Sequence, residues 1–382
     1  MEASPDLVLE TCAAELMLVD RYPAKQCKHM SIVPFPHLTY AGAGEMLAAQ
    51  AAPKLQAIGL WALSRTLEQD EVITLPHNGQ MFTERMLCIE SFRCDPTFSF
   101  ALNGIGCTLN PGETATLHDG RTLDEIHLYV EALRLNYSPQ FLNNLAFSLG
   151  PDQRVQMFDG RMMNKLDLYL ESQHVFPTYS DSYFALALRI PTGSTLTLKD
   201  GRVLNRQQLY VEAISWNTNN ASAYCNLANT LFSSDPTNNT IVLADGRLMD
   251  RLSLYFEAVR CDPNDSLYYR NIALLLDEGD SLRFPDGRTL SYFEILLEAL
   301  RCDPQSMRAF EMIVDAVPRD YLWRRSNHSL LFQKETNPLF ATLLLAVQRL
   351  EEIGVLPLAH QAMLEDMLEG WTWADAITLV SL

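Results

Sequence analysis

The sequence predicts an all-α fold: an α-solenoid of repeated helix pairs, each with a short β-arm or turn inserted, and helical caps at both ends. Three observations predict it. The tripeptide Asp-Gly-Arg recurs five times, at steps of 40, 41, 45 and 41 residues. A helix-capping residue follows each copy at a fixed distance, and a helical stripe of Leu, Tyr and Ala follows each cap. Self-similarity at a fixed period is the signature of a repeat architecture.

Each Asp-Gly-Arg segment is predicted to be a structural turn. Apolar residues lie two and four positions before each Asp, as at Ala115 and Leu117, which is the alternation of a short strand. Asp-Gly is a preferred pair where a hairpin needs positive φ. A calcium or ligand site is the alternative, but each copy offers one carboxylate, whereas Ca²⁺ takes roughly six to eight oxygens. The predicted turn residues are Asp119, Gly120, Arg121, Asp159, Gly160, Arg161, Asp200, Gly201, Arg202, Asp245, Gly246, Arg247, Asp286, Gly287 and Arg288, preceded by a degenerate copy, Asn78-Gly79-Gln80.

The second helix of each pair is predicted to begin just after the turn. Six residues that favour the helix N-cap lie in register there: Thr83, Asp124, Asn164, Asn205, Asp250 and Ser291. Such a side chain accepts a hydrogen bond from an N–H of the first turn, which is worth about 1 kcal/mol. A Glu recurs inside these helices, at Glu131, Glu171, Glu212, Glu257 and Glu298. It can pair with the Arg of the turn. At Glu131, Glu257 and Glu298 it can instead pair with an Arg three residues later, and the sequence leaves both open.

The first helix of each pair carries an aromatic residue or Leu, then Leu or Ile, then a small residue. Copies occupy 141–146, 223–228 and 268–273. The small residue would let a neighbouring helix pack closely. This helix pair resembles a tetratricopeptide repeat: Tyr224, Leu227, Ala228 and Leu231 match the first helix of that family, and Tyr255, Ala258 and Pro263 match the second. The family repeats about every 34 residues, whereas this chain has extra residues between the helices that carry Asp-Gly-Arg.

The resemblance divides the chain into three segments. Residues 1–52 are expected to be an N-terminal helix and loop, 53–320 the repeat array, and 321–382 a C-terminal helical cap. Such a cap covers the last apolar face of a solenoid. The alternative for the last segment is a module that docks a partner, with Trp371 and Trp373 as anchors.

Charge and composition exclude several classes of function. The net charge is −18, from 29 Lys+Arg against 47 Asp+Glu, so we expect no nucleic-acid partner and no docking on anionic membranes. The apolar runs are too short to span a bilayer, and the N-terminus lacks a positively charged leader region, so we expect a cytoplasmic protein. Three of the eight cysteines share an Arg-Cys-Asp-Pro context, which favours a structural role over redox or metal chemistry. Histidines show no zinc spacing, so no metal or cofactor is expected.

No catalytic motif occurs in the sequence. We therefore expect a non-enzymatic scaffold or adaptor that binds peptide segments of partner proteins in a concave groove, as the resemblance implies. The alternative is an enzyme or regulatory subunit whose activity resides in the terminal regions. The net charge favours a basic or neutral partner segment.

The candidate groove residues lie on the first helices. Asn144, Asn226 and Asn271 share one position, with Asn103 and Asn143 adjacent to it. Either these amides hold a peptide backbone, as in some proteins that this repeat resembles, or they are polar residues tolerated on an exposed face. The neighbours Phe184, Tyr224 and Arg270 would then choose among partner sequences.

Overall fold

The structure is a computed structural model, which describes residues 53–67, 71–74, 81–231, 239–277, 279–303 and 306–316. The predicted N-terminal helix and loop (1–52) and C-terminal cap (321–382) lie outside the described residues. So do the degenerate turn Asn78-Gly79-Gln80 and the two residues Trp371 and Trp373. The three-segment division of the chain therefore stays a prediction.

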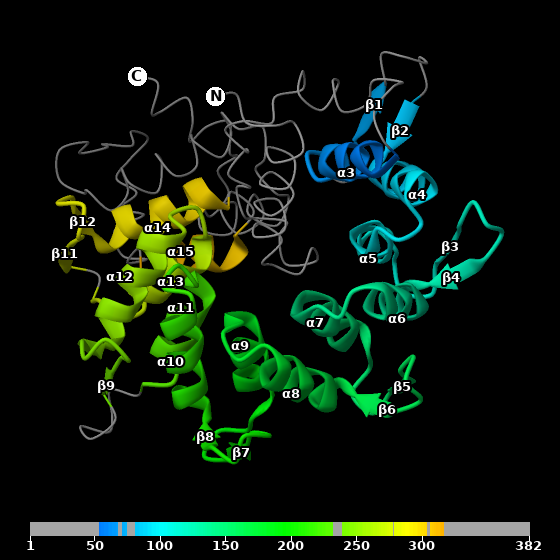
Figure 1. Ribbon diagram of the computed structural model, residues 1–382. Coiled ribbons are helices and arrows are strands. Elements are labelled where there is room, and N and C mark those ends of the chain that lie inside the picture. Colours follow the sequence, from blue (N-terminus) through cyan, green and yellow to red (C-terminus); the bar gives the residue numbers. More distant parts are fainter. Residues whose placement is uncertain are drawn as a thin grey trace, which may run out of the picture. The chain divides into compact units, whose positions relative to one another are not determined.

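The all-α prediction is wrong. The described residues form thirteen helices and twelve three-residue strands, and the strands pair as six two-stranded antiparallel sheets. Helices and hairpins alternate along the chain, as Figure 1 shows, which is an α/β repeat pattern. The alternating segment is not an insertion into a helix pair. It is a hydrogen-bonded hairpin that every repeat contains.

Each repeat is a first helix, a hairpin and a second helix. The first three repeats are α3 (Pro53–Ser64), β1 (Val72–Thr74), β2 (Met81–Thr83), α4 (Glu84–Cys94); α5 (Ser99–Cys107), β3 (Thr114–Thr116), β4 (Thr122–Asp124), α6 (Glu125–Leu135); and α7 (Pro139–Ser148), β5 (Arg154–Gln156), β6 (Met162–Asn164), α8 (Lys165–Val175). The next three are α9 (Ser180–Arg189), β7 (Thr195–Thr197), β8 (Val203–Asn205), α10 (Arg206–Trp216); α11 (Ala221–Asn229), β9 (Thr240–Val242), β10 (Leu248–Asp250), α12 (Arg251–Cys261); and α13 (Ser266–Ala273), β11 (Ser281–Arg283), β12 (Thr289–Ser291), α14 (Tyr292–Cys302). Helix α15 (Met307–Ala316) follows.

The Asp-Gly pair lies at the tip of each hairpin from β3–β4 onward. In β3–β4, the N–H of Gly120 donates to the Leu117 carbonyl (3.0 Å) and the N–H of Leu117 donates to the Arg121 carbonyl (2.8 Å). Gly120 has φ of 85°. This is the three-residue hairpin loop in which a turn is followed by a left-handed residue, a position that favours glycine. The Gly of each other Asp-Gly-Arg copy also has positive φ, and its N–H makes the same turn bond.

The six predicted N-caps are confirmed. In every repeat the last residue of the second strand caps the second helix, and its side chain accepts the backbone N–H three residues on. At Asn164, Asn205 and Ser291, the side chain of the residue three positions later also accepts the backbone N–H of the cap residue. This second bond completes a capping box. The chain therefore passes from strand to helix with no intervening residue.

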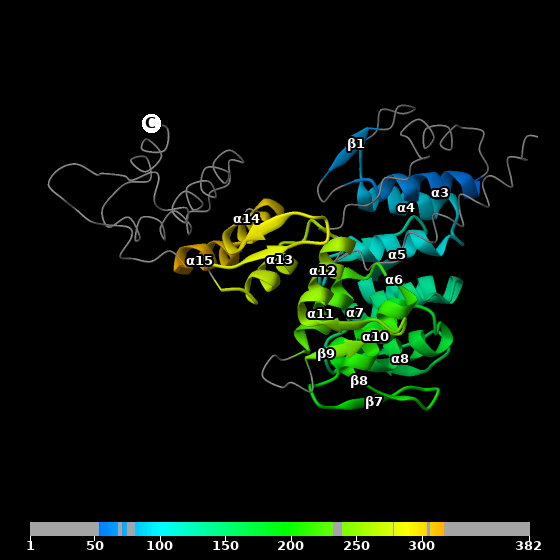
Figure 2. The ribbon, with the colours of Figure 1, turned by 90° about the vertical axis from the view of Figure 1, so that its left-hand side faces the viewer.

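The core lies between the two helices of each repeat, which pack against each other in all six cases. Helices α3 to α10 also lie side by side in chain order (Figures 1 and 2). A small residue permits the close approach: a Cβ added to Gly106 would lie 2.8 Å from Cε1 of Tyr129. Fully buried Ala146, Ala187, Ala228 and Ala273 occupy the same position in the later repeats.

The chain divides into two compact units between Thr218 and Asn219. We call them the N-terminal unit and the C-terminal unit and describe each by itself. Within the described residues, no helix is both long and apolar enough to cross a membrane.

Candidate functional site

In the N-terminal unit, the predicted groove asparagines are buried. Asn103 and Asn144 are each 4% exposed and Asn143 is 6% exposed. The Nδ2 of Asn144 donates to the Oδ1 of Asn103 (2.9 Å), which joins α7 to α5. Both amide groups also lie 3.8 Å from the sulfur of Cys107. Here the amides form a contact between neighbouring first helices, so they are not displayed on an exposed face.

The amide contact belongs to a larger polar network that sequence reasoning missed. The hydroxyl of Tyr129 donates to Cys107 (3.5 Å) and to Glu125 (3.4 Å). Ser148 donates to the same Glu125 oxygen (2.5 Å). Burial is the main cause that raises the pKa of Tyr129. The network links α5, α6 and α7. The one local signal for it is the four-residue spacing of Glu125 and Tyr129, which puts both on one helix face.

Two other groove candidates of the N-terminal unit occupy one repeat position. Asn143 lies on α7, and its Oδ1 is buried and receives no hydrogen bond from the part of the chain that is described. Phe184 lies at the same position on α9, is partly exposed, and packs on Tyr210 with ring centroids 5.9 Å apart. Of these two candidates, only Phe184 is partly exposed.

In the C-terminal unit, the same asparagine position is partly exposed. The Nδ2 of Asn271 donates to the sulfur of Cys225 (3.4 Å), which joins α13 to α11. Asn226 donates to the carbonyl of Ser222 in its own helix (2.9 Å). No described group donates to the Oδ1 of Asn226 or of Asn271. Burial raises the pKa of the Cys225 thiol to about 12, so it stays protonated.

The structure separates the two remaining candidates of the C-terminal unit. Tyr224 is fully buried, so its ring belongs to the core and does not face a partner. Arg270 is partly exposed, and its Nε is buried without a partner among the described residues. Asn226, Arg270 and Asn271 are the groove candidates that this unit leaves accessible.

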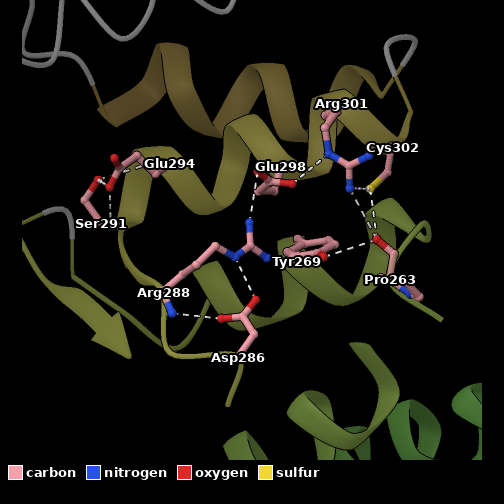
Figure 3. Close-up of polar contacts among 9 residues, drawn as sticks. All are labelled: Pro263, Tyr269, Asp286, Arg288, Ser291, Glu294, Glu298, Arg301 and Cys302. Carbon is pink, nitrogen blue, oxygen red and sulfur yellow. Dashed lines mark hydrogen bonds and ion pairs between the residues drawn. The ribbon is translucent and has the colours of Figure 1, made fainter. Parts of the chain in front are cut away.

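The Asp-Gly-Arg segments form a repeated brace between hairpin and helix. In all five copies one Asp oxygen accepts the backbone N–H of the Arg at 2.9–3.0 Å, and the other accepts its Nε at 2.6–2.8 Å. The bond from the Arg N–H is the main cause that holds the pKa of each Asp below its usual value. Figure 3 shows this arrangement at Asp286 and Arg288.

The Arg of each brace also reaches the Glu of the second helix. Its Nη1 lies 2.8–3.4 Å from that carboxylate in all five copies. In three copies the same Glu accepts the Arg three residues later as well, as Glu298 does from Arg301 in Figure 3. The two pairings that the sequence left open therefore form together. Exposed ion pairs contribute at most about 1 kcal/mol each, so the brace positions the hairpin more than it stabilises the fold.

One brace is different from the others. Glu171 is the least exposed of the five, with a side chain 10% exposed. It accepts hydrogen bonds from Arg161 (3.0 Å), from the hydroxyl of Tyr137 (2.9 Å) and from Lys199. Burial opposes its ionisation, but these three bonds outweigh burial and lower the pKa of Glu171 to about 2.

The cysteines of the Arg-Cys-Asp-Pro segments are partly buried. Burial raises the pKa of Cys94, Cys261 and Cys302, which keeps them as thiols at neutral pH. Cys302 donates to the carbonyl of Pro263 (3.5 Å), beside the hydroxyl of Tyr269 (Figure 3). Among the described residues, no group of three His, Cys, Asp or Glu side chains is arranged to hold a metal ion.

Comparison with known proteins does not assign the chain to a family. No family model matches the sequence, and no curated protein matches it. The helix–hairpin–helix repeat is what the structure establishes, and the resemblance to tetratricopeptide repeats stays a prediction.

Proposed function

We propose that this protein is a non-enzymatic scaffold or adaptor that binds extended peptide segments of partner proteins on its first helices. One observation carries the proposal. Asn226 and Asn271 occupy the same position on successive first helices of the C-terminal unit and are partly exposed, and no described residue donates to their Oδ1 atoms. An amide oxygen can accept the N–H of a peptide backbone without regard to its side chains.

Arg270 supports the same use. It precedes Asn271 on α13, and its guanidinium offers five N–H donors in a planar fork. No described carboxylate pairs with it, and its Nε has no partner within the described ranges. Next to two amides that hold a backbone, this side chain would favour segments that present oxygen acceptors.

The repeat architecture and the charge of the chain also favour a protein partner. Stacked helical repeats present extended surfaces that suit extended segments. The net charge of −18 disfavours nucleic acid. We expect this scaffold to act in the cytoplasm, with no cofactor.

The test is a selection of peptides of random sequence that bind the full chain, followed by affinity measurements on variants. Asn226→Ala with Asn271→Ala should weaken a selected peptide by about tenfold or more, since each lost bond costs ~0.5–1.5 kcal/mol. Asn264→Ala, an exposed asparagine in the turn after α12, is the matched control and should leave the affinity unchanged. A selection that yields no binder, or peptides that bind the double variant as tightly as the original chain, would contradict the proposal.

A further inference from the structure

Two exposed apolar side chains lie near the ends of α7 and α9, two first helices that contact each other. Phe147 is 38% exposed and Leu188 is 44% exposed. They occupy the same repeat position, 41 residues apart, and α7 contacts α9. Phe147 directly follows the small residue Ala146, and Leu188 directly follows Ala187. Both therefore lie in the last turn of a first helix. Exposed apolar residues that recur at one repeat position on neighbouring helices can form a contiguous apolar patch, and such patches are typical of binding sites.

Three cations border these apolar residues. The Nζ of Lys165 donates to the carbonyl of Phe147 (3.2 Å). Arg189 follows Leu188 and lies over the ring of Tyr169, with 5.9 Å between the guanidinium carbon and the ring centroid. Arg206 donates from Nε to the carbonyl of Ile190 (2.8 Å). We call Phe147, Lys165, Leu188, Arg189 and Arg206 the α7–α9 corner.

The charge of the α7–α9 corner is not neutralised by the described residues. Eight of the ten other described cations of the N-terminal unit have a described carboxylate within 4.0 Å, and Lys54 and Arg154 do not. The eight are Arg65, Arg85, Arg93, Arg121, Arg134, Arg161, Lys199 and Arg202. No described carboxylate lies that close to Lys165, Arg189 or Arg206.

The carboxylates nearest in sequence to Lys165 and Arg206 are already engaged. Asp167 accepts from the backbone of Asn164 in a capping box, and Asp200 and Glu212 both pair with Arg202. In a chain with a net charge of −18, this corner is a local excess of positive charge beside apolar surface.

We propose that the α7–α9 corner binds an acidic segment of a partner protein that carries an aromatic or large aliphatic residue. The apolar residue packs on Phe147 and Leu188, and carboxylates beside it pair with Lys165 and Arg189. This inference rests on the proposed function and names the partner class for the N-terminal unit. An acidic segment differs from the basic or neutral partner segment that the net charge of the chain predicts. The reason is that screening confines electrostatic attraction to about 8 Å at physiological salt, so the nearest charges decide.

The probe is a fluorescein-labelled peptide of about 12 residues made of Glu, Asp, Phe and Leu, measured by anisotropy with the full chain. Two comparison peptides carry Lys in place of the acids, or Ala in place of Phe and Leu. We expect the acidic, apolar peptide to bind at least tenfold more tightly than either. Raising the salt from about 50 to about 300 mM should weaken it severalfold, because the ion pairs are exposed.

Charge reversal locates the site. Lys165→Glu with Arg189→Glu should weaken the acidic, apolar peptide at least tenfold. Acidic residues suit the first turn of α8, so Lys165→Glu is compatible with that helix. The matched control, Lys54→Glu with Arg154→Glu, changes the charge of the same unit equally at exposed residues and should change the affinity less than about twofold. If circular dichroism shows that the first variant is unfolded, Lys165→Gln with Arg189→Gln replaces it.

Two results would overturn this inference: equal losses in both double variants, or equal binding of the Lys-bearing peptide. Its failure is distinguishable from failure of the proposed function. If selected peptides bind the original chain and the Lys165/Arg189 double variant equally tightly, the acidic partner segment is wrong and the proposed scaffold function still stands. A selection that yields no binding peptide would contradict both the proposed function and the acidic partner segment.

Discussion

The N-terminal and C-terminal units use one asparagine position in two ways. Asn144 and Asn271 each donate from Nδ2 to the preceding first helix, the first to Asn103 and the second to Cys225. Asn144 is enclosed by that contact, whereas Asn271 stays partly exposed with its oxygen open. In these two repeats the side chain has the same direction, whereas Asn226, at the same position, donates to Ser222 of its own helix. The residues around this position decide whether the amide is buried or partly exposed.

The largest expected effect comes from removing the enclosed amide. Asn144→Ala leaves the Oδ1 of Asn103 buried without its donor, and an unsatisfied buried group costs about 1–3 kcal/mol of stability. Asn271→Ala removes a weaker bond to sulfur at a partly exposed site and should cost less than about 1 kcal/mol. Urea unfolding followed by circular dichroism measures both. Equal losses would show that the two positions do not differ as we describe.

The hairpin turns should not distinguish the units. Gly120 of the N-terminal unit and Gly246 of the C-terminal unit both have φ of 85°. A side chain in this conformation costs about 1–2 kcal/mol, so Gly120→Ala and Gly246→Ala should lower stability by similar amounts. The thermal midpoint of each variant checks this. A loss at one site and none at the other would mean that the repeated turns are not equivalent.

The Glu171 brace should give the N-terminal unit an acid-sensitive contribution. The pKa of Glu171 is lowered from 4.5 to about 2. A carboxyl group with a lowered pKa contributes stability that is fully present above about 4.5 and is lost as the pH falls toward about 2. Glu171→Gln should therefore be less stable than the original chain at pH 7, and the gap should close between about pH 4.5 and 2.

Thermal midpoints measured across that pH range test the Glu171 prediction. Glu257→Gln, in the corresponding brace of the C-terminal unit, is the comparison variant. If the gap between the Glu171→Gln variant and the original chain is the same at every pH, the three bonds to this carboxylate do not have the strength that we assign.

The smallest expected effect concerns the exposed pairs at the ends of the second helices. Arg134 in the N-terminal unit and Arg301 in the C-terminal unit pair with a Glu three residues earlier. Replacing either with Ala should cost no more than about 0.5 kcal/mol, because exposed helix pairs contribute little. Chemical denaturation at low and high salt measures this. A larger loss would mean that these exposed ion pairs contribute more to the stability of the fold than we expect.

Local pattern was enough to predict the parts of the fold that depend on nearby residues. The six capping residues and the Asp-Gly turns make hydrogen bonds to residues only a few positions away. The local sequence is therefore enough to predict them. The fold class was missed because strands of three residues, such as Thr114–Thr116, carry little signal beside long helices. Burial of Asn144 was missed because it depends on Asn103, which lies 41 residues away.

We propose that the first helices bind partner segments and that the hairpins position the two helices of each repeat. Amide hydrogen exchange of the full chain, with and without a peptide whose binding requires Asn226 and Asn271, tests it most directly. We predict slower exchange in α11 and α13 on binding, with the β9–β10 and β11–β12 hairpins unchanged. Slower exchange confined to these hairpins would contradict the account and assign the partner to the Asp-Gly-Arg segments.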